Sequence, residues 1–262
     1  ARDLSFGQNK NIGGVLPHNN HPYFNQILNG IMDAAFSSGY HIVLLPSEYN
    51  HAVELDYLEQ LKHKNFTALI FTSHGIPLSV LAKYTRYGQI VCCEDTGEYQ
   101  ISAVYSNRQP AYLAAFEYLK QLKVQQISLL LSRNLAQSPT RIAVTAAYQQ
   151  VFHHPPAPQL MVGGMTSFTD GYRAAAQLTK HTPKIDCYFT NGDDIAAGVR
   201  QYYLDQHRTP PILIGQEKQL SSYLLKIPTI DHHFFTIGQK AFAVALSHQH
   251  QEFSFESELV LP

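Results

Sequence analysis

Short apolar runs alternate with longer helical patterns along almost the whole chain, and this alternation restricts the fold more than any other feature. Eight runs are rich in Val, Ile and Leu and lack strict alternation of polar and apolar residues, namely 12–16, 41–45, 68–71, 90–93, 127–131, 160–162, 187–189 and 212–214. Such runs are typical of parallel strands that are buried on both faces of a sheet.

Helical patterns fill the spaces between these runs. The clearest extends from residue 24 to residue 36, where apolar residues recur at steps of three and one, and Gly39 follows as a C-cap. Further helices are expected near 55–61, 110–122 and 195–202. Repeated strand–helix–strand units form right-handed crossovers, so the sequence predicts an α/β fold of doubly wound parallel sheets.

The number of strands predicts two lobes. Eight or more strands are many for one open sheet in a chain of 262 residues, so each lobe is expected to have its own smaller sheet. Apolar residues make up 45% of the chain, which is enough to form a core in each lobe.

The charge balance argues against nucleic-acid binding by this segment. The 19 Lys and Arg residues are balanced by 20 Asp and Glu residues, and the formal net charge is −1. A DNA-binding surface needs a clear excess of positive charge to displace counterions. We therefore expect no specific DNA binding by this segment alone.

The sequence contains no motif of a catalytic, metal or cofactor site. It lacks a Gly-x-Ser-x-Gly elbow, a phosphate loop and a Gly-x-Gly-x-x-Gly turn. The histidines, including the pair His232 and His233, fall mostly near expected loops or helix ends, so they are interpreted as solvated surface residues. Cys92, Cys93 and Cys187 lack metal-site spacing and indicate a reduced, cytoplasmic protein. We expect neither an enzyme nor a bound metal or cofactor.

Six segments of the chain resemble, in the same order, motifs of the LacI/GalR family of transcription regulators. Residues 1–7 resemble the end of the hinge helix that precedes the family's core. Residues 12–24 resemble the first strand and its Asn-Pro-Phe-Phe turn, with His21 in place of Asn. Residues 104–108 resemble the family's Val-x-Ser-Asp-Asn, with Asn107 at the Asp position.

The other three segments lie in the second half of the chain. Residues 191–198 resemble Asn-Asp-x-x-Ala-x-Gly, where Asp193 keeps the acid and Gly192 replaces Asn. Residues 212–217 resemble Val-Val-Gly-Phe-Asp, and residues 228–231 resemble Leu-Thr-Thr-Val. Each motif is weak alone, but six in order over nearly the full length are a strong resemblance.

The resemblance implies the type I periplasmic-binding-protein architecture, with two lobes joined by three crossovers and a ligand in the cleft between them. The implied division is a hinge remnant at 1–7, an N-terminal lobe of 8–106 plus 231–249, and a C-terminal lobe of 107–230 plus 250–262.

The resemblance also implies a function. The chain is expected to be the effector-binding and dimerisation core of a DNA-binding transcriptional regulator, a repressor that senses a sugar or sugar derivative. Operator DNA would be bound by an N-terminal headpiece that is absent from this sequence. The alternative is an extracytoplasmic sugar-binding protein of a transport system, which shares the fold. The hinge-like residues 1–7 and the reduced cysteines favour the regulator.

Candidate ligand residues follow from the expected sheets, because ligands of open α/β sheets bind beyond the carboxyl ends of the strands. Carboxylates form strong hydrogen bonds with sugar hydroxyls, and an aromatic ring can cover the apolar face of the sugar. The candidates are His18, Tyr23, Phe24, Ser73, Glu94, Arg141, Asp193, Glu217 and Asp231.

Several candidates have structural alternatives. Phe24 begins the apolar stripe of its helix and is equally suited to core packing, and Asp193 is equally suited to a helix N-cap. Glu217 has no evident capping role, so ligand contact is favoured. Arg141 is a substitute for an Arg that the family has one turn later and this chain lacks. Asp231, at an expected crossover, either lines the cleft or only fixes the hinge.

The resemblance also implies a homodimer with an isologous interface, since a two-fold symmetric protein reads a palindromic operator. The predicted interface includes the helix at 48–63 and the segment at 75–87, which has more apolar area than a solvated helix needs. The alternative is that half of this face packs onto its own sheet.

Overall fold

The computed structural model describes residues 9–18, 22–132, 138–182, 184–247 and 249–262. The predicted hinge remnant at 1–7 and the turn residue His21 lie outside these residues. The chain forms two compact units: the first contains Ala1–Ser106 and His233–Phe255, and the second contains Asn107–His232 and Glu256–Pro262. The chain therefore passes between the units three times.

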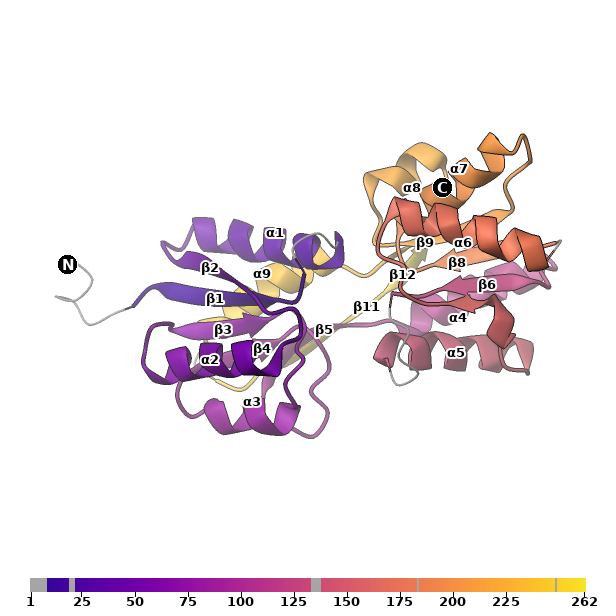
Figure 1. Cartoon of the computed structure of the whole chain (residues 1–262). Helices are drawn as coiled ribbons and strands as arrows, with labels where there is room; N and C mark the ends of the chain where they lie inside the picture. Colours follow the sequence, from indigo (N-terminus) through magenta and orange to yellow (C-terminus); the bar gives the residue numbers. More distant parts are fainter. Residues whose placement is uncertain (1–8, 19–21, 133–137, 183, 248) are drawn as a thin grey trace. The chain divides into compact units, whose positions relative to one another are not determined.

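The first unit is a six-stranded sheet with strand order β11-β5-β4-β3-β1-β2 (Figure 1). The pairs among β1 to β5 in this order are parallel. The strands are β1 (Asn11–Leu16), β2 (His41–Pro46), β3 (Ala68–Phe71), β4 (Gln89–Cys92), β5 (Ser102–Asn107) and β11 (Glu252–Glu256). Helices α1 (Pro22–Phe36) and α9 (Phe234–Ala245) pack on one hydrophobic core, and α2 (His51–Lys62) and α3 (Leu78–Tyr84) pack on the other.

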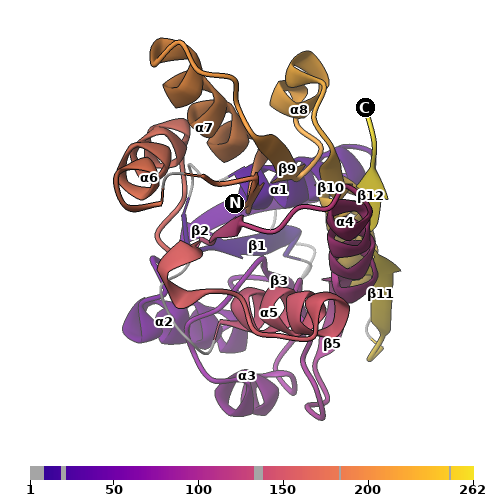
Figure 2. The same cartoon turned by 90° about the vertical axis from the view of Figure 1, so that its right-hand side faces the viewer.

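The second unit is a six-stranded sheet with strand order β12-β10-β9-β8-β6-β7. Its strands are β6 (Ile127–Leu130), β7 (Met161–Val162), β8 (Cys187–Thr190), β9 (Ile212–Gln216), β10 (Thr229–Asp231) and β12 (Glu258–Val260). Strand β12 is antiparallel to β10, and the other pairs are parallel. Helices α4 (Gln109–Gln121) and α5 (Pro139–Phe152) cover one face, and α6 (Phe168–His181) and α7 (Asp193–Asp205) cover the other (Figure 2). A short helix, α8 (Leu220–Leu225), follows β9.

The predicted fold class is confirmed: both units are doubly wound α/β sheets. All eight apolar runs overlap strands. Six of these strands lie inside a sheet, where residues buried between two helical layers must be apolar, and the other two, β2 and β7, are edge strands. Strands β5, β10, β11 and β12 were not among the predicted apolar runs. β11 and β12 are edge strands and β5 and β10 are inner strands, but all four contain more polar residues, so apolar runs do not mark them.

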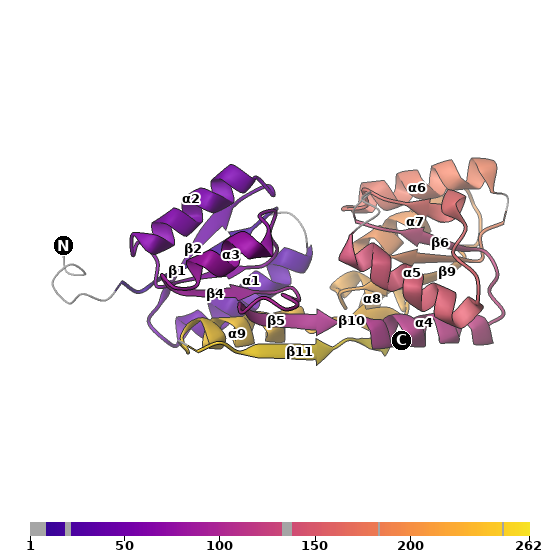
Figure 3. The same ribbon diagram turned by 90° about the horizontal axis from the view of Figure 1, so that it is seen from below.

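The second and third crossings between the units lie a few residues later in the chain than the predicted lobe boundaries. Residues 250–255 belong to the first unit, because β11 lies beside β5 at the edge of that sheet (Figure 3). Residues 231–232 belong to the second unit, because β10 pairs with β9. Within the described residues, no helix combines the length and apolar character that a membrane span requires.

Each unit contains one helix pair in very close contact, and glycine makes the contact possible. In the first unit, a Cβ on Gly30 of α1 would lie 2.0 Å from the Phe235 carbonyl oxygen, and one on Gly238 of α9 would lie 2.0 Å from that of Ile27. In the second unit, the corresponding distances are 2.1 Å from Gly171 to the Ile195 oxygen and 1.9 Å from Gly198 to the Phe168 oxygen. These glycines set the separation of α1 from α9 and of α6 from α7.

Candidate functional site

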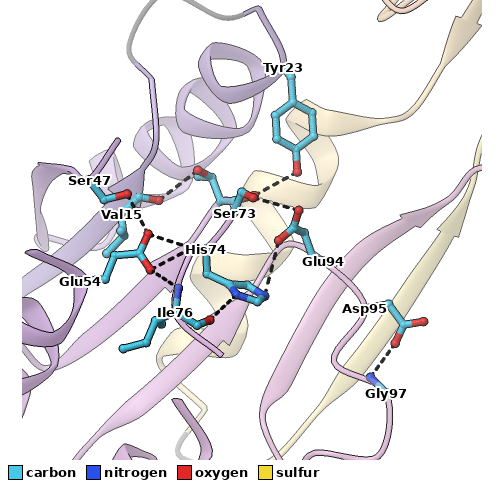
Figure 4. Close-up of polar contacts among 12 residues, drawn as sticks. Val15, Tyr23, Ser47, Glu54, Ser73, His74, Ile76, Glu94, Asp95 and Gly97 are labelled. Atoms are coloured by element: carbon cyan, nitrogen blue, oxygen red, sulfur yellow. Dashed lines mark hydrogen bonds and ion pairs between the residues drawn. The ribbon is translucent and has the colours of Figure 1, made fainter. Parts of the chain in front are cut away.

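The carboxyl ends of the parallel strands in the first unit carry a cluster of hydrogen-bonded polar side chains (Figure 4). Ser73, directly after β3, is buried and donates from Oγ to Glu94 Oε1 at 2.9 Å. Nδ1 of His74 lies 2.8 Å from the Ile76 carbonyl oxygen, so this nitrogen carries the proton. Nε2 of His74 is 3.6 Å from Glu94 Oε2, and the two form an ion pair when the ring carries both protons. The structure thus brings together the predicted Ser73 and Glu94 and adds His74.

The predicted aromatic residues of this unit have two different environments. Phe24 is 5% exposed and belongs to the core, as its place in the apolar stripe allowed. Tyr23 is half-buried, its hydroxyl donates to the Thr72 carbonyl oxygen at 3.0 Å, and its ring packs edge-on against Phe24 and Phe234. His18 is exposed, with its ring 5.5 Å from that of Tyr49. Tyr23 therefore lies at the strand ends, while Phe24 serves the core.

A second carboxylate of the first unit, Glu54 in α2, is fully buried but faces the backbone. Its oxygens accept hydrogen bonds from the amides of Gly75 and Ile76, at distances from 2.7 to 3.0 Å, and from the Ser47 hydroxyl at 2.9 Å (Figure 4). Glu54 therefore anchors the loop between β3 and α3.

In the second unit, the strongest indication of a functional position is the backbone of Glu217, directly after β9. Glu217 has φ of 85° and Lys218 has φ of 48°, so two consecutive non-glycine residues are in the left-handed region. Such a conformation costs about 1–3 kcal/mol per residue and persists only where the surroundings impose it, most often at functional sites. The Glu217 amide is fixed by a 2.7 Å hydrogen bond to the Ile230 carbonyl oxygen.

The Glu217 side chain is buried, 5% exposed, among charged groups. Burial raises the pKa of Glu217 well above its usual range, the neighbouring charge of Asp193 raises it further, and Arg108 opposes the rise. A Cβ on Gly192 would lie 3.7 Å from Glu217 Oε2, so the carboxyl group lies close to the start of α7. A protonated Glu217 both donates and accepts hydrogen bonds, whereas the sequence predicted acceptance only.

Asp193 is fully buried in the first turn of α7, and both of its oxygens have partners within the unit. Oδ1 accepts from the Thr229 hydroxyl at 2.6 Å and Oδ2 from the Gln219 amide at 2.7 Å. Burial raises the pKa of Asp193 to about 7. The N-cap residue of α7 is Gly192, so the expected alternative of an Asp193 cap is wrong. Asp193 anchors the segment after β9, and its contact with a ligand stays a prediction.

The cation that acts on Glu217 is Arg108, which the sequence analysis missed. Arg108 Nη1 donates to Thr140 Oγ1 at 3.1 Å, and its charge opposes the burial-driven rise in the pKa of both Glu217 and Tyr112. The proposed substitute, Arg141, lies half-buried in the first turn of α5 and is not among the charges that shift Glu217. Arg108 directly follows β5, a strand that the apolar pattern did not reveal.

Two further residues hold the segment after β9. Asp231, at the end of β10, forms a 2.9 Å ion pair with Lys218 Nζ. His232 is 2% exposed, with Nε2 2.9 Å from Gln216 Oε1 and Nδ1 2.7 Å from Ser257 Oγ. The expectation that this histidine is a solvated surface residue is therefore wrong. His232 follows β10, is the last residue of this segment of the second unit, and is buried there.

Comparison with known families gives a direct result. Residues 9–244 match the family described as periplasmic binding proteins and sugar binding domain of LacI family. The chain belongs to this family. It is 31% identical to catabolite control protein B of Bacillus subtilis over 246 residues, which are 94% of this chain and 78% of that protein. It is 25% identical to the NTD biosynthesis operon regulator NtdR of the same species, over 92% of this chain and 75% of that protein.

Solved LacI-family structures share the fold. A LacI family regulator from Lactobacillus casei with bound sucrose matches with a TM-score of 0.85 and 17% identity, over 96% of this chain and 98% of that one. A LacI family regulator from Enterococcus faecium with bound ribose matches with a TM-score of 0.78 and 18% identity, over 96% and 97%. The similar curated proteins are transcription regulators, which supports the regulator reading over a transport protein.

Three of the segments that resemble LacI-family motifs lie at the carboxyl ends of strands. Residues 104–108 end β5 and enter α4, residues 191–198 lead from β8 into α7, and residues 212–217 are β9 with Glu217. The sequence predicted Glu217 and Asp193 at this edge. It missed Arg108, Gln216 and His232, whose roles depend on contacts between segments far apart in the chain.

Proposed function

We propose that this chain is the effector-binding core of a LacI-family repressor and that the strand-end edge of the second unit contacts a neutral sugar or a close derivative. The observation that carries the proposal is Glu217, a buried acid in a left-handed backbone whose pKa is influenced by the charge of Arg108. Backbone strain and a buried acid with a raised pKa are features of sites shaped for a ligand. The solved relatives with bound ribose, sucrose and glucose support a sugar as the chemical class.

Calorimetry with ribose, glucose and sucrose tests the proposal on three forms of the protein. Glu217→Ala removes hydrogen bonds to the sugar and is expected to weaken binding by about tenfold to a hundredfold. Glu217→Gln resembles the protonated acid and is expected to stay within about threefold of the wild type. Glu117→Ala, on the exposed side of α4, is the control and leaves affinity unchanged.

Two results would contradict this assignment. A sugar that binds Glu217→Ala within about twofold of the wild type shows that Glu217 is not an effector residue. Preference for a phosphorylated sugar makes Arg108, rather than the two acids, the main contact, because like charges repel.

We propose that operator DNA is bound by a separate headpiece. The net charge of −1 argues against operator binding by this segment, so we expect the cytoplasmic regulator to read DNA through another part of its chain. A gel-shift titration with promoter DNA is expected to show no specific complex for residues 1–262. A specific complex at submicromolar protein would overturn this part of the proposal.

A homodimer is the expected assembly, and the exposed apolar side chains favour a surface other than the predicted one. In the predicted segment 75–87, Ile76 and Leu81 are buried in the core of their own unit, and Tyr84 donates a hydrogen bond to Glu59. Helix α8 instead exposes large apolar side chains: Leu220 (71%), Tyr223 (80%) and Leu224 (67%). We propose that two copies pair through α8, since a contiguous apolar face on so short a helix is suited to a partner surface.

Sedimentation equilibrium at micromolar protein tests the pairing. Tyr223→Glu is expected to shift the dimer toward monomer, because a buried unpaired charge disfavours association. Phe36→Glu, on a side chain that is 92% exposed in the other unit, is the control and is expected to remain dimeric. A wild-type monomer, or a dimer that only Phe36→Glu dissociates, would contradict the α8 interface.

A further inference from the structure

Three residues mark the places where the chain enters or leaves the second unit, and they are hydrogen-bonded to one another. The unit begins at Asn107, ends its main segment at His232 and resumes at Glu256, next to Ser257. The Ser257 amide donates to the Asn107 carbonyl oxygen at 2.9 Å, and Ser257 Oγ lies 2.7 Å from His232 Nδ1. One hydrogen-bonded cluster thus links a residue at each of the three crossings.

The cluster continues from His232 to the end of β9. His232 Nε2 is 2.9 Å from Gln216 Oε1, which also accepts a 3.2 Å hydrogen bond from the Tyr112 hydroxyl. Gln216 Nε2 donates to the Thr190 carbonyl oxygen at 2.8 Å. His232, Gln216 and Tyr112 are each at most 3% exposed, so water does not compete for these bonds.

The bonds of Gln216 fix the proton on the histidine. A backbone carbonyl only accepts, so the amide nitrogen of Gln216 must face Thr190 and its oxygen must face His232. Nε2 of His232 therefore carries a hydrogen. In the neutral ring, Nδ1 then accepts from the Ser257 hydroxyl.

Gln216 immediately precedes Glu217, whose left-handed backbone needs restraint on both sides. On the following side, the Gln219 amide is bonded to Asp193 and Lys218 is paired with Asp231. On the preceding side, the restraint on the Gln216 side chain comes from the cluster around His232.

We propose that His232 is a positioning residue for effector binding: its Nε2–H group, acting through Gln216, holds Glu217 in place and ties it to the three crossings. His232 does not contact the effector in this scheme. Its effect on effector binding rests on the proposed function, but its effect on the position of Glu217 does not.

Two variants separate the two sides of the ring. His232→Gln places an amide nitrogen where Nε2 lies and preserves a donor to Gln216, whereas His232→Asn reaches only the Nδ1 side and Ser257. The first readout is amide hydrogen exchange at Glu217 in the effector-free protein, since this amide is bonded to Ile230. We expect exchange about tenfold faster in His232→Asn and within about twofold of the wild type in His232→Gln.

Equal exchange rates in the two variants, or an unchanged rate in His232→Asn, would overturn the proposal. Thermal unfolding of both variants controls for a general loss of structure, and exchange at Ile31 in the other unit should not change. Assignment of the Nδ1–H tautomer to His232 by NMR of the wild type would also overturn the proposal, whether or not any sugar binds.

The second readout is a double-mutant cycle with effector. His232→Asn is expected to weaken sugar binding by about tenfold when Glu217 is present. In the Glu217→Ala background the same substitution is expected to weaken binding by less than about twofold, because His232 acts through Glu217. Equal losses in both backgrounds contradict the positioning role. If no sugar binds the wild type, the proposed function fails, and the exchange experiment still decides the role of His232.

Discussion

Each unit contains a fully buried carboxylate that anchors the segment after a strand, but the two are held by different partners. Glu54 accepts hydrogen bonds from two backbone amides and a hydroxyl, whereas Asp193 accepts from one amide and a hydroxyl and lies near Glu217. Burial raises the pKa of Asp193 to about 7. Both acids serve the fold, because each fixes the backbone of the segment that follows a strand.

The candidate effector acids differ in the same way. The Glu94 side chain is 34% exposed, with Ser73 and His74 as partners, while Glu217 is nearly inaccessible and has a strained backbone. An exposed carboxylate adapts to a ligand at little cost. A buried carboxylate with a strained backbone is held in one geometry before the ligand binds. We therefore expect the second unit to determine which effector binds.

The largest expected effect concerns the glycine contacts that the two units share. Gly198→Ala and Gly238→Ala place a methyl group within 2.0 Å of a backbone oxygen, and each should lower the free energy of unfolding by about 3 kcal/mol. Gly14→Ala is the control, since its Cβ would meet no atom closer than 3.7 Å. Urea unfolding measures the loss of stability. A small loss for one of the two variants would show that the helix pair of that unit can move apart to accommodate the methyl group.

The buried acids give the next effect. Glu54→Ala removes the acceptor of the buried Gly75 and Ile76 amides and should cost about 2–3 kcal/mol, because these donors are left without a partner. Asp193→Asn should cost about 1 kcal/mol or less at pH 6, where the native acid is largely protonated. Denaturant unfolding of both variants checks this order, and equal losses would remove the distinction between the two anchors.

The pH dependence of stability should separate the units further. Because the pKa of Asp193 rises from 3.8 to about 7 on folding, the folded state binds more protons between these values. Stability therefore falls as pH increases through this range, by at most about 1.4 kcal/mol per pH unit from this group. Asp193→Asn should flatten the slope between pH 4 and 7, and an unchanged slope would assign it to other groups.

The smallest effect is expected from the ion pairs. Lys218 pairs with Asp231 in the second unit and Lys62 with Glu59 in the first, and both lysines are well exposed. Lys218→Ala should change the free energy of unfolding by less than about 1 kcal/mol, and Lys62→Ala should have no larger effect because its pair is exposed. A larger loss for Lys218→Ala would show that the pair helps to hold the left-handed backbone at Glu217.

The sequence predicts the fold well because buried central strands must be apolar. Strand β11 was missed because polar residues are tolerated at the edge of a sheet, and the inner strand β5 was missed because its sequence, SAVYSN, contains polar residues and its second half is only partly buried. At the site, Glu217 follows an evident strand and was predicted. His232 was taken for a surface residue, since its burial depends on Gln216 and Ser257, and no local pattern reports such distant contacts.

The position of α9 in the chain has a consequence for synthesis. Helix α9 packs on α1 through Gly238 and Gly30, yet it is made only after the whole main segment of the second unit. At typical translation rates, the interval between residues 106 and 245 lasts roughly 7–28 s. During that time Ile27 and Ile31, buried in the finished core, have no covering helix. The second unit lacks only its last strand, β12, at that stage, so we expect the second unit to complete its core before the first.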